Sequence, residues 1–401
     1  MPSDEAPYAW VSTQTRSLFR VLALTLVECQ RRIGRETQIR SQANCSRNFH
    51  GSRSLPRSST RHSLRPVSHE GQMLRSLLFS VLLFFPQLAW AKECSGRDLI
   101  AQMPAPERKA LLERAAQVRF GEGLLWRAER GEKGITLFGS FHLPHPYTQA
   151  HEERIMPLAE DAELTFFEMN AEDIARFERD MQSAPDLMFV GHGEATLPTL
   201  LSEAEWDDLS GKLRARGFPP FMAAKMKPMF ASMMLGMSPC KLRQMQAGRG
   251  GIDRVLAQRL YDENLPSRSI EDYRTALTLL DAFPAKKQTE LLRLSLLQDL
   301  DAEDMTETLY RSYIDEEIAL TWEYTRALSL ESGGAEAEED FALFEKLLLT
   351  DRNKAWMDEL RRAEASRILV VVGAAHLMGD TGLLRLLEAD GYEITRLSMT
   401  P

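Results

Sequence analysis

The chain contains 401 residues, with 49 Lys and Arg against 58 Asp and Glu, and its formal net charge is -9. The first 91 residues hold twelve Arg and five acidic residues, a charge of +7, so the remainder carries about -16 (-9 less 7). A chain this acidic lacks the basic face from which phosphate binding starts, which excludes nucleic acid as a partner.

A secretory signal peptide is predicted at residues 73–91. The segment begins Met73-Leu-Arg75, continues as an apolar run too short to span a bilayer comfortably, and ends in the A-x-A pattern Ala89-Trp-Ala91. We therefore expect an exported protein, periplasmic or extracellular, whose mature form starts near Lys92 and has no stable membrane span. Residues 1–72 show no periodic pattern and are interpreted as a non-native, disordered extension, with an Arg-rich transit or nucleic-acid arm as the alternative.

Two of the four cysteines, Cys94 and Cys240, lie in the mature chain. An even pair in an exported protein is usually bridged, and this bridge would close a long loop, worth roughly 4–5 kcal/mol on the chain-entropy model. The sequence therefore predicts a disulfide between them. Two buried thiols are the alternative.

A first α/β unit opens the mature chain. Its expected elements are a helix, a two-stranded hairpin around Gly131-Glu-Lys-Gly134, a second helix and a third strand, at residues 106–118, 123–130, 134–142, 152–161 and 163–170. The second strand ends at His142, and the third ends in the carboxylate Glu168. Because strand, helix and strand form a βαβ unit, these two side chains are expected at the same end of the sheet.

Residues 171–350 are predicted to be a large, mainly helical insertion. Residues 202–205 match a capping box, and residues 276–300 and 310–330 show three-four apolar spacing. Residues 265–271, which end in Glu271, form a short element that could return to the sheet.

A second α/β unit closes the chain, with a helix, a strand, a helix and a last strand expected at residues 351–365, 368–373, 380–389 and 392–397. The fold class that follows is α/β, with a mixed central sheet and flanking helices. One domain over residues 92–401 would have its core at 92–170 and 351–401 and the helical insertion at 171–350.

Two copies of a G-x-x-H pattern, Gly139-Ser-Phe-His142 and Gly373-Ala-Ala-His376, follow apolar runs in the two units. Ligands of open α/β sheets bind beyond the carboxyl ends of the strands, so these histidines could meet over one site. Converging imidazoles indicate a metal ion, with Glu168 as a third ligand that balances charge. The alternative is that the glycines allow tight turns and the histidines are ordinary satisfied groups.

Three further residues are candidates for chemistry at this site. Glu271 could serve as a ligand or a general base, or be structural. Arg352 and Asn353 open the helix before the second histidine strand, where they could orient a carbonyl or stabilise an oxyanion. A charged first helical turn with a surface arginine is the alternative for that pair.

The remaining histidines are weaker candidates. His145 lies in a proline-flanked loop and is expected to be solvated, with a further metal ligand as the alternative. His151 and His192 have no cluster around them. The sequence contains no G-x-S-x-G, H-E-x-x-H or C-x-x-C motif and no phosphate-binding glycine loop, which removes the common hydrolase, zincin, redox and nucleotide-binding classes.

The set of motifs resembles the TraB/GumN/Tiki family. The resemblance extends over most of residues 94–397 and rests on Leu137 to His142, Phe167-Glu168, Lys227-Pro228, Gly251-Ile-Asp253, Ile270-Glu271, Arg352-Asn353 and Val372 to Gly379. The last segment is the most specific, and the chain is similar to secreted bacterial members of the GumN type. Two departures are Ser140, where a threonine is expected, and Ser269-Ile-Glu271, where Gly-Leu-Glu is common.

The resemblance implies an EreA/ChaN-like and Tiki-like α/β core. For the Tiki branch it implies peptide cleavage that depends on manganese or cobalt, and zinc is a further candidate metal. Carried over to this sequence, His142, Glu168 and His376 become the metal ligands, with Glu271, Arg352 and Asn353 in support.

The leading hypothesis is a metal-dependent hydrolase, specifically a peptidase, acting on a peptide or protein substrate. In this hypothesis the ion lowers the pKa of a bound water, and Glu271 or Glu168 handles its proton. A non-catalytic protein that binds a peptide or a partner is the second hypothesis, of the kind suggested by pheromone-shutdown and polysaccharide-assembly relatives. An esterase on the same scaffold is the third.

Overall fold

The computed structural model describes residues 94–400, apart from 276, 277, 279–281 and 299. Every described residue belongs to one compact unit, Ala89–Pro401. The predicted extension and signal peptide lie outside the described residues.

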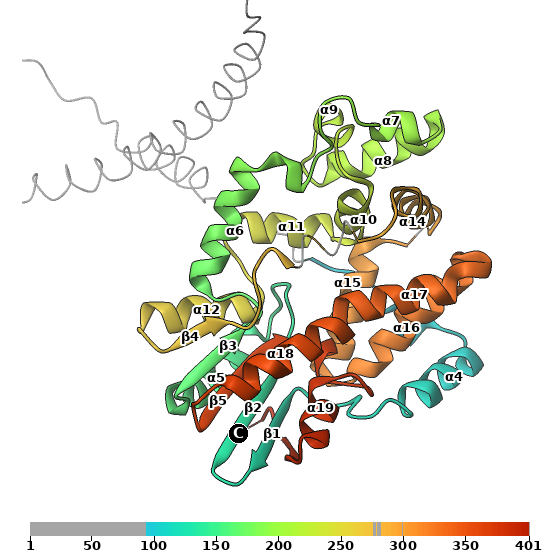
Figure 1. Cartoon of the computed structure of the whole chain (residues 1–401). Coiled ribbons are helices and arrows are strands. Elements are labelled where there is room, and N and C mark those ends of the chain that lie inside the picture. The colour runs from blue at the N-terminus through green and yellow to red at the C-terminus, as the bar shows by residue number, and fades with distance from the viewer. Residues whose placement is uncertain (1–93, 276–277, 279–281, 299, 401) are drawn as a thin grey trace, which may run out of the picture. The chain divides into compact units, whose positions relative to one another are not determined.

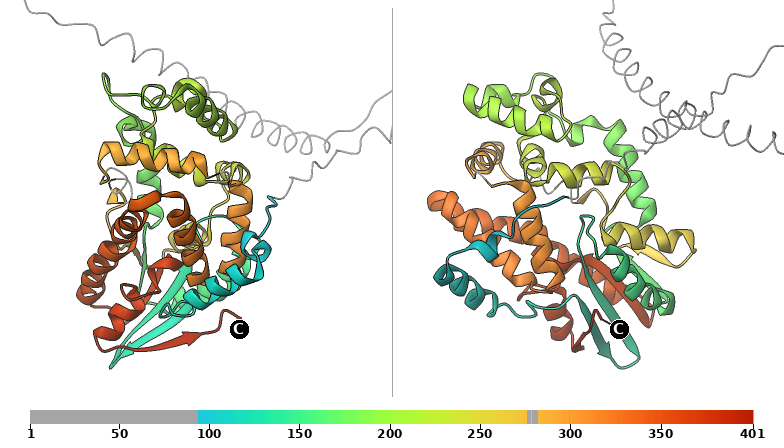
Figure 2. Two further views of the ribbon diagram at one scale, coloured as in Figure 1. Left: turned by 90° about the vertical axis from the view of Figure 1, so that its right-hand side faces the viewer. Right: turned by 180° about the vertical axis from the view of Figure 1, so that it is seen from behind.

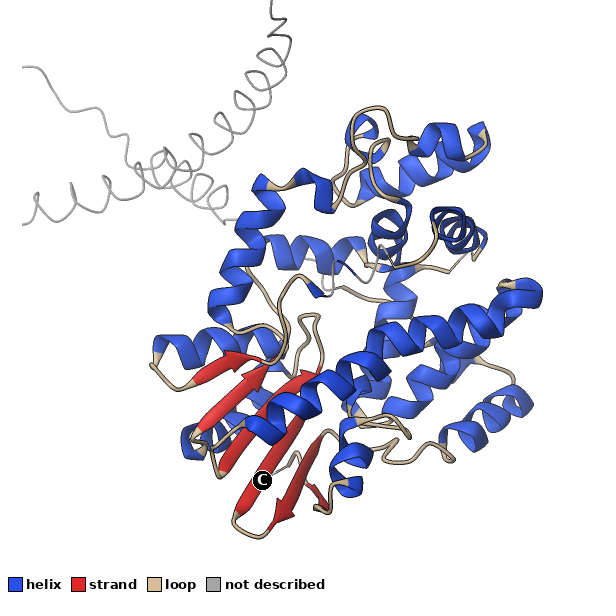
Figure 3. Ribbon diagram, viewed as in Figure 1, coloured by secondary structure: helices blue, strands red, loops and turns tan. Residues whose placement is uncertain are grey.

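This unit contains a six-stranded sheet, which lies in the lower part of the view in Figure 1 and Figure 3. Its strands, in spatial order, are β4 (Ser267–Ser269), β3 (Leu164–Phe167), β5 (Arg367–Gly373), β2 (Lys133–Ser140), β1 (Leu125–Arg130) and β6 (Glu393–Leu397). The four strands from β4 to β2 are parallel, and β1 is antiparallel to both of its neighbours. The sheet is therefore mixed, as the sequence predicted.

Alternating side chains of the central strands supply two cores, one on each face. Phe138, Leu369 and Val371 pack on one face against α5 (Thr148–Asp161) and α12 (Ile252–Asp262). Leu137, Val370 and Val372 pack on the other face against α18 (Asp351–Arg362) and α19 (Leu383–Ala389). Burial on both faces explains why β2 and β5 read as continuous apolar runs. The views of Figure 2 show helices on both sides of the sheet.

The segment between β3 and β5 is mainly helical, as predicted, but it is not one block. β4 pairs in parallel with β3 and returns the chain to the sheet. The helices before it are α6 (Ala171–Ser183), a 3-10 turn (Pro185–Leu187), α7 (Leu197–Leu200), α8 (Glu203–Ala215), α9 (Pro220–Ala223), α10 (Pro228–Gly236), α11 (Pro239–Gln246) and α12. Those after it are α14 (Ala285–Leu297), α15 (Ala302–Ile314), α16 (Ile318–Ser332), a 3-10 turn (Gly334–Glu336), α17 (Ala337–Glu345) and a π-helical turn (Lys346–Thr350).

Some of these helices have a hydrophobic core of their own, away from the sheet. Leu209 of α8, Phe230 of α10 and Leu292 of α14 are buried in it. Within the described ranges, none of the helices combines the length and the apolar character that crossing a membrane requires.

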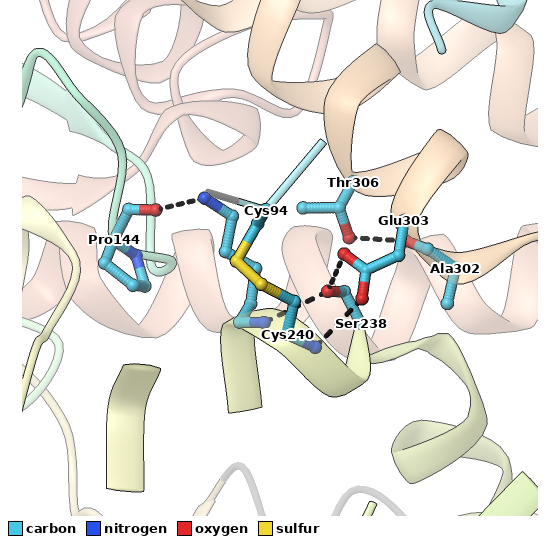
Figure 4. Close-up of a disulfide and its surroundings, with 8 residues drawn as sticks. Cys94, Pro144, Ser238, Cys240, Ala302, Glu303 and Thr306 are labelled. Atoms are coloured by element: carbon cyan, nitrogen blue, oxygen red, sulfur yellow. Dashed lines mark hydrogen bonds between the residues drawn. A yellow bond between two sulfur atoms is a disulfide. The ribbon is translucent and has the colours of Figure 1, made fainter. Parts of the chain in front are cut away.

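The N-terminal end of the described chain is tied to α11 by a disulfide between Cys94 and Cys240, 146 residues apart (Figure 4). The segment that follows forms two helices, α3 (Leu99–Gln102) and α4 (Ala105–Ala115). Glu303 of α15 lies beside the bridge and accepts hydrogen bonds from the Ser238 hydroxyl and, at 2.9 Å, from the Cys240 N–H. The predicted pairing of these cysteines is confirmed.

Candidate functional site

The four parallel strands end at one edge of the sheet, and a polar side chain follows each of them. These side chains are His142 after β2, Glu168 after β3, Glu271 after β4 and His376 after β5. Arg352 and Asn353 join them from the first turn of α18. The structure thus brings all six residues singled out in the sequence into one cluster.

The guanidinium of Arg352 lies at the centre of this cluster and is 6% exposed. Its Nη2 donates to Glu168 Oε2 at 2.6 Å and to Glu271 Oε1 at 2.5 Å, while its Nη1 lies 3.0 Å from His376 Nε2. Nη1 also donates to the carbonyl of Leu348, in the π-helical turn, at 3.0 Å. A planar fork with five donors suits this arrangement, because one side chain serves two carboxylates and an imidazole.

Glu168 is held as a carboxylate between these groups. Burial favours its neutral form, but His376, His142, Arg352 and the Gly373 N–H together lower the pKa of Glu168 below its usual range. The Gly373 N–H donates to its Oε1 at 2.7 Å. The same oxygen lies 3.8 Å from His142 Nε2 and 3.9 Å from His376 Nε2, so both imidazoles converge on it.

His376 is buried and neutral. Burial, opposed by Glu168 and assisted by Arg352, lowers the pKa of His376 to about 3. Its Nδ1 lies 2.7 Å from Asn353 Oδ1, while Asn353 Nδ2 donates to the carbonyl of Thr381 at 2.9 Å. Because the amide group is thus oriented with its oxygen toward the ring, the proton sits on Nδ1 and the lone pair on Nε2.

His142 is the most exposed of the three converging side chains, with 57% of its side chain accessible. Its Nδ1 lies 2.9 Å from Asp253 Oδ2, at the start of α12. Against the desolvation of its ring, Asp253 and Glu168 raise the pKa of His142 to about 9. Sequence reasoning had given Asp253 no role, and its one signal was the segment Gly251-Ile-Asp253.

Close packing explains the glycines of the site. A Cβ on Gly373 would lie 2.9 Å from His142 Nε2 and 3.3 Å from Glu168 Oε1, and one on Gly139 would lie 2.9 Å from the Cα of Ala374. Neither glycine has a positive φ. The glycines of the G-x-x-H pattern are therefore explained by close contacts with the converging side chains and with the backbone at Ala374, and not by an unusual backbone conformation.

The other histidines among the described residues lie outside the cluster. His192 is exposed. His145 is 8% exposed and packs against His151, Tyr310 and Tyr313, so its predicted solvation is wrong. The loop that carries it folds against α15, where the apolar faces of the tyrosines cover the ring.

A model of the TraB/PrgY/gumN family matches residues 124–396 of the chain, a stretch that begins just before β1 and ends within β6. The chain belongs to this family. No curated protein matches the chain in sequence. The matched stretch contains every residue of the cluster, so the family and the site concern the same part of the molecule.

The donor chemistry of this family member's cluster fits a divalent ion. Two imidazoles and a carboxylate are ligands that such ions accept, and ligating histidines are usually oriented by a second group, as Asn353 and Asp253 do here. Ser140 Oγ and Asp253 Oδ1 are also buried without a hydrogen-bond partner among the described residues, and both residues line the cavity at the site.

The spacing is more open than that of a coordinated set. Among the described residues, one group of three His, Cys, Asp or Glu side chains has ligand atoms that all lie within 4.8 Å of one another, and it is Cys94, Cys240 and Glu303 rather than the candidate site. The two sulfurs of that group are joined in the disulfide. Since both Nε2 atoms lie within 3.9 Å of Glu168 Oε1, the separation above 4.8 Å is that between the two imidazoles. Binding at about 2 Å from each nitrogen requires these rings to close and Arg352 to leave His376.

Proposed function

We propose that this TraB/PrgY/gumN family member is a metal-dependent hydrolase of peptides. The observation that carries the proposal is the convergence of His142 Nε2 and His376 Nε2 on one oxygen of Glu168, at the ends of three adjacent parallel strands. The three side chains would hold a manganese, cobalt or zinc ion. Such an ion activates water and polarises the scissile carbonyl.

The protein's own residues then have separable roles. Glu168, kept ionised, balances the positive charge of the ion, and Arg352 beside it offers positive charge to a developing oxyanion. Both oxygens of Glu271 are occupied by Arg352 and by the Trp356 N–H, at 3.0 Å, so we propose that Glu271 positions Arg352. Asn353, whose amide atoms bond His376 and Thr381, positions the imidazole.

We further propose that the protein is exported and acts in the periplasm or outside the cell. A disulfide between Cys94 and Cys240 supports an oxidising compartment. The N-terminal sequence of protein purified from cells that express the full-length chain tests this. A start near Lys92 is expected, and an uncleaved N-terminus would contradict it.

Activity is tested on the same protein after its metal has been removed. A peptide library is incubated with manganese, cobalt or zinc, and thermal unfolding is followed with each ion. We expect metal-dependent cleavage that is lost in His142→Ala and His376→Gln variants and kept in His192→Ala, an exposed histidine away from the cluster. No turnover with any ion, together with no metal-dependent thermal shift, would count against the proposal.

A non-catalytic binding protein is the second candidate. The observation in its favour is that Arg352 already donates to His376 Nε2 and pairs with both glutamates, so a positive charge occupies the centre of the cluster without an ion. In that case the His142→Ala and His376→Gln variants would bind peptide as well as the wild-type protein does.

A further inference from the structure

A cavity of about 290 Å³ opens beside His142 and Glu168. One of its walls is apolar and includes Ile174 and Phe177 of α6 and Met245 of α11. Two cationic side chains, Arg249 and Arg254, also line it. Substrate groups next to the reacting atoms would lie in this cavity, so its charged residues would influence which substrates bind.

The two arginines differ in their pairing. Arg254 donates to Glu178 Oε1 at 2.5 Å, so its charge is already compensated. The guanidinium of Arg249 has no hydrogen bond or ion pair with any residue in the described part of the chain. Its backbone is nevertheless fixed, because the Arg249 N–H donates to the carbonyl of Gln244 at 3.0 Å just after α11 ends.

The loop that carries Arg249 is packed tightly onto the site. Two residues further on, a Cβ at Gly251 would lie 2.3 Å from the carbonyl carbon of His142. The Ile252 N–H then donates to the carbonyl of Phe141 at 3.3 Å. The position of the Arg249 backbone is therefore set relative to His142, although its side chain is exposed.

Arg249 also lines two neighbouring cavities, of about 640 and 740 Å³, in addition to the one at the site. A peptide leaving the small cavity toward either of the larger ones passes this residue. An unpaired guanidinium at such a junction offers two parallel N–H donors, the geometry that matches a carboxylate.

We propose that Arg249 binds a carboxylate of the substrate, so that the protein prefers peptides carrying one close to the bond that is cleaved. This inference rests on the proposed peptidase function, under which the anions available on a substrate are carboxylates. The carboxylate can come from the C-terminus of a short peptide or from an Asp or Glu side chain.

Three peptides of otherwise identical sequence test the proposal on the metal-loaded protein: a free C-terminal acid, its C-terminal amide, and the amide with one internal Glu. We expect kcat/KM to be about ten-fold higher with a correctly placed carboxylate, as for one charge-assisted hydrogen bond at an exposed site. A preference shown only by the free acid assigns the carboxylate to the C-terminus, and one shared by the Glu peptide assigns it to a side chain.

Variants connect this preference to Arg249. Arg249→Gln is expected to lower kcat/KM for the preferred peptide to the level of the amide and to leave the amide unchanged, while Arg249→Lys keeps part of the preference. Arg254→Gln, in the same cavity, serves as the matched control and keeps the full preference. Equal rates for the acid, the amide and the Glu peptide, or an equal effect of Arg249→Gln on all three, would overturn the inference.

Calorimetric titration with the same peptides separates this inference from the proposed function. Carboxylate-dependent binding that Arg249→Gln abolishes, without any turnover, would support the role of Arg249 and overturn the peptidase. Turnover without a carboxylate preference would do the reverse.

Discussion

At the scale of single residues, the site depends on a buried cation. Arg352 compensates Glu168 and Glu271 at once, and both carboxylates are largely withdrawn from water. Removing one partner of a buried ion pair leaves the other charge without compensation, which costs far more than the pair itself contributes.

The Arg352→Ala variant should therefore be destabilised by about 3–5 kcal/mol. Arg361→Ala, on the same helix, removes a half-exposed arginine paired with Asp390 and should cost less than about 1 kcal/mol. Urea unfolding of both variants measures the difference. Equal losses of stability would show that Arg352 is not the residue that holds the two glutamates.

Asp253 should set both the charge and the metal affinity of His142. The Asp253→Asn variant keeps the size of the side chain but removes the negative charge 2.9 Å from Nδ1. In metal-free protein the pKa of His142, about 9, should fall toward 6.5, and metal affinity, corrected for the proton that the ion displaces from the wild-type ring, should fall about 10- to 100-fold. NMR titration of the ring and metal titration follow the two effects, and an unchanged pKa would exclude Asp253 as the cause.

The sequence predicted the members of the cluster better than their contacts. Glycine before histidine at the end of an apolar run identified His142 and His376. By contrast, the bonds of Arg352 join it to Glu271 and Glu168 across 81 and 184 residues, and no local pattern encodes them. The same holds for Asp253, which meets His142 across 111 residues.

At the scale of elements, apolar patterning decided what could be predicted. β2 and β5 are buried on both faces, so both strands are continuous apolar runs that the sequence reveals directly. β4 is three residues long, Ser-Arg-Ser, and lies at the edge of the sheet, where β3 is the strand it pairs with. The sequence therefore gives little indication of this strand, although the strand positions Glu271 at the site.

Two uncharged histidines, one from the loop before α5 and one from α5 itself, are buried beside Tyr313 of α15 and should make the protein sensitive to acid. Burial lowers the pKa of His145 to about 3 and also lowers that of His151. Between about pH 3 and 6.5 the unfolded chain binds more protons at His145 than the folded one does, and His151 acts in the same direction below about pH 6.5. Stability should then fall as the pH drops below 6.5, by up to about 1.4 kcal/mol per pH unit for each group.

Urea unfolding of the wild-type protein at several pH values between 4 and 8, compared with His145→Phe, isolates the contribution of His145. Neither ring nitrogen of this residue has a hydrogen-bond partner among the described residues, so phenylalanine removes a titrating group without breaking a bond. The variant should lose stability less steeply below pH 6.5. Parallel curves would refute the assignment.

At the scale of the whole molecule, the two α/β units could be predicted, and the arrangement of the helices between them could not. Some helices of residues 171–350 have a local signal, such as the capping box of α8, but which faces meet depends on contacts such as that of Leu209 with the core shared by α10 and α14. One long-range contact, the disulfide between Cys94 and Cys240, was predictable without any apolar pattern, because paired cysteines of a protein expected to be exported are usually bridged.

This bridge joins the first described residue to α11. The loop that follows this helix carries Arg249 and packs against His142. On the chain-entropy model, opening a loop of 146 residues costs roughly 5 kcal/mol, and removal of native disulfides typically costs 2–5 kcal/mol. Reducing agent should lower the guanidinium midpoint of the wild-type protein accordingly. A Cys94→Ser/Cys240→Ser variant should start from the lower midpoint and not respond to reductant.

Equal midpoints for oxidised and reduced protein would mean that the bridge does not stabilise the fold, and that contacts of α11 such as that between Cys240 and Glu303 are sufficient to hold it.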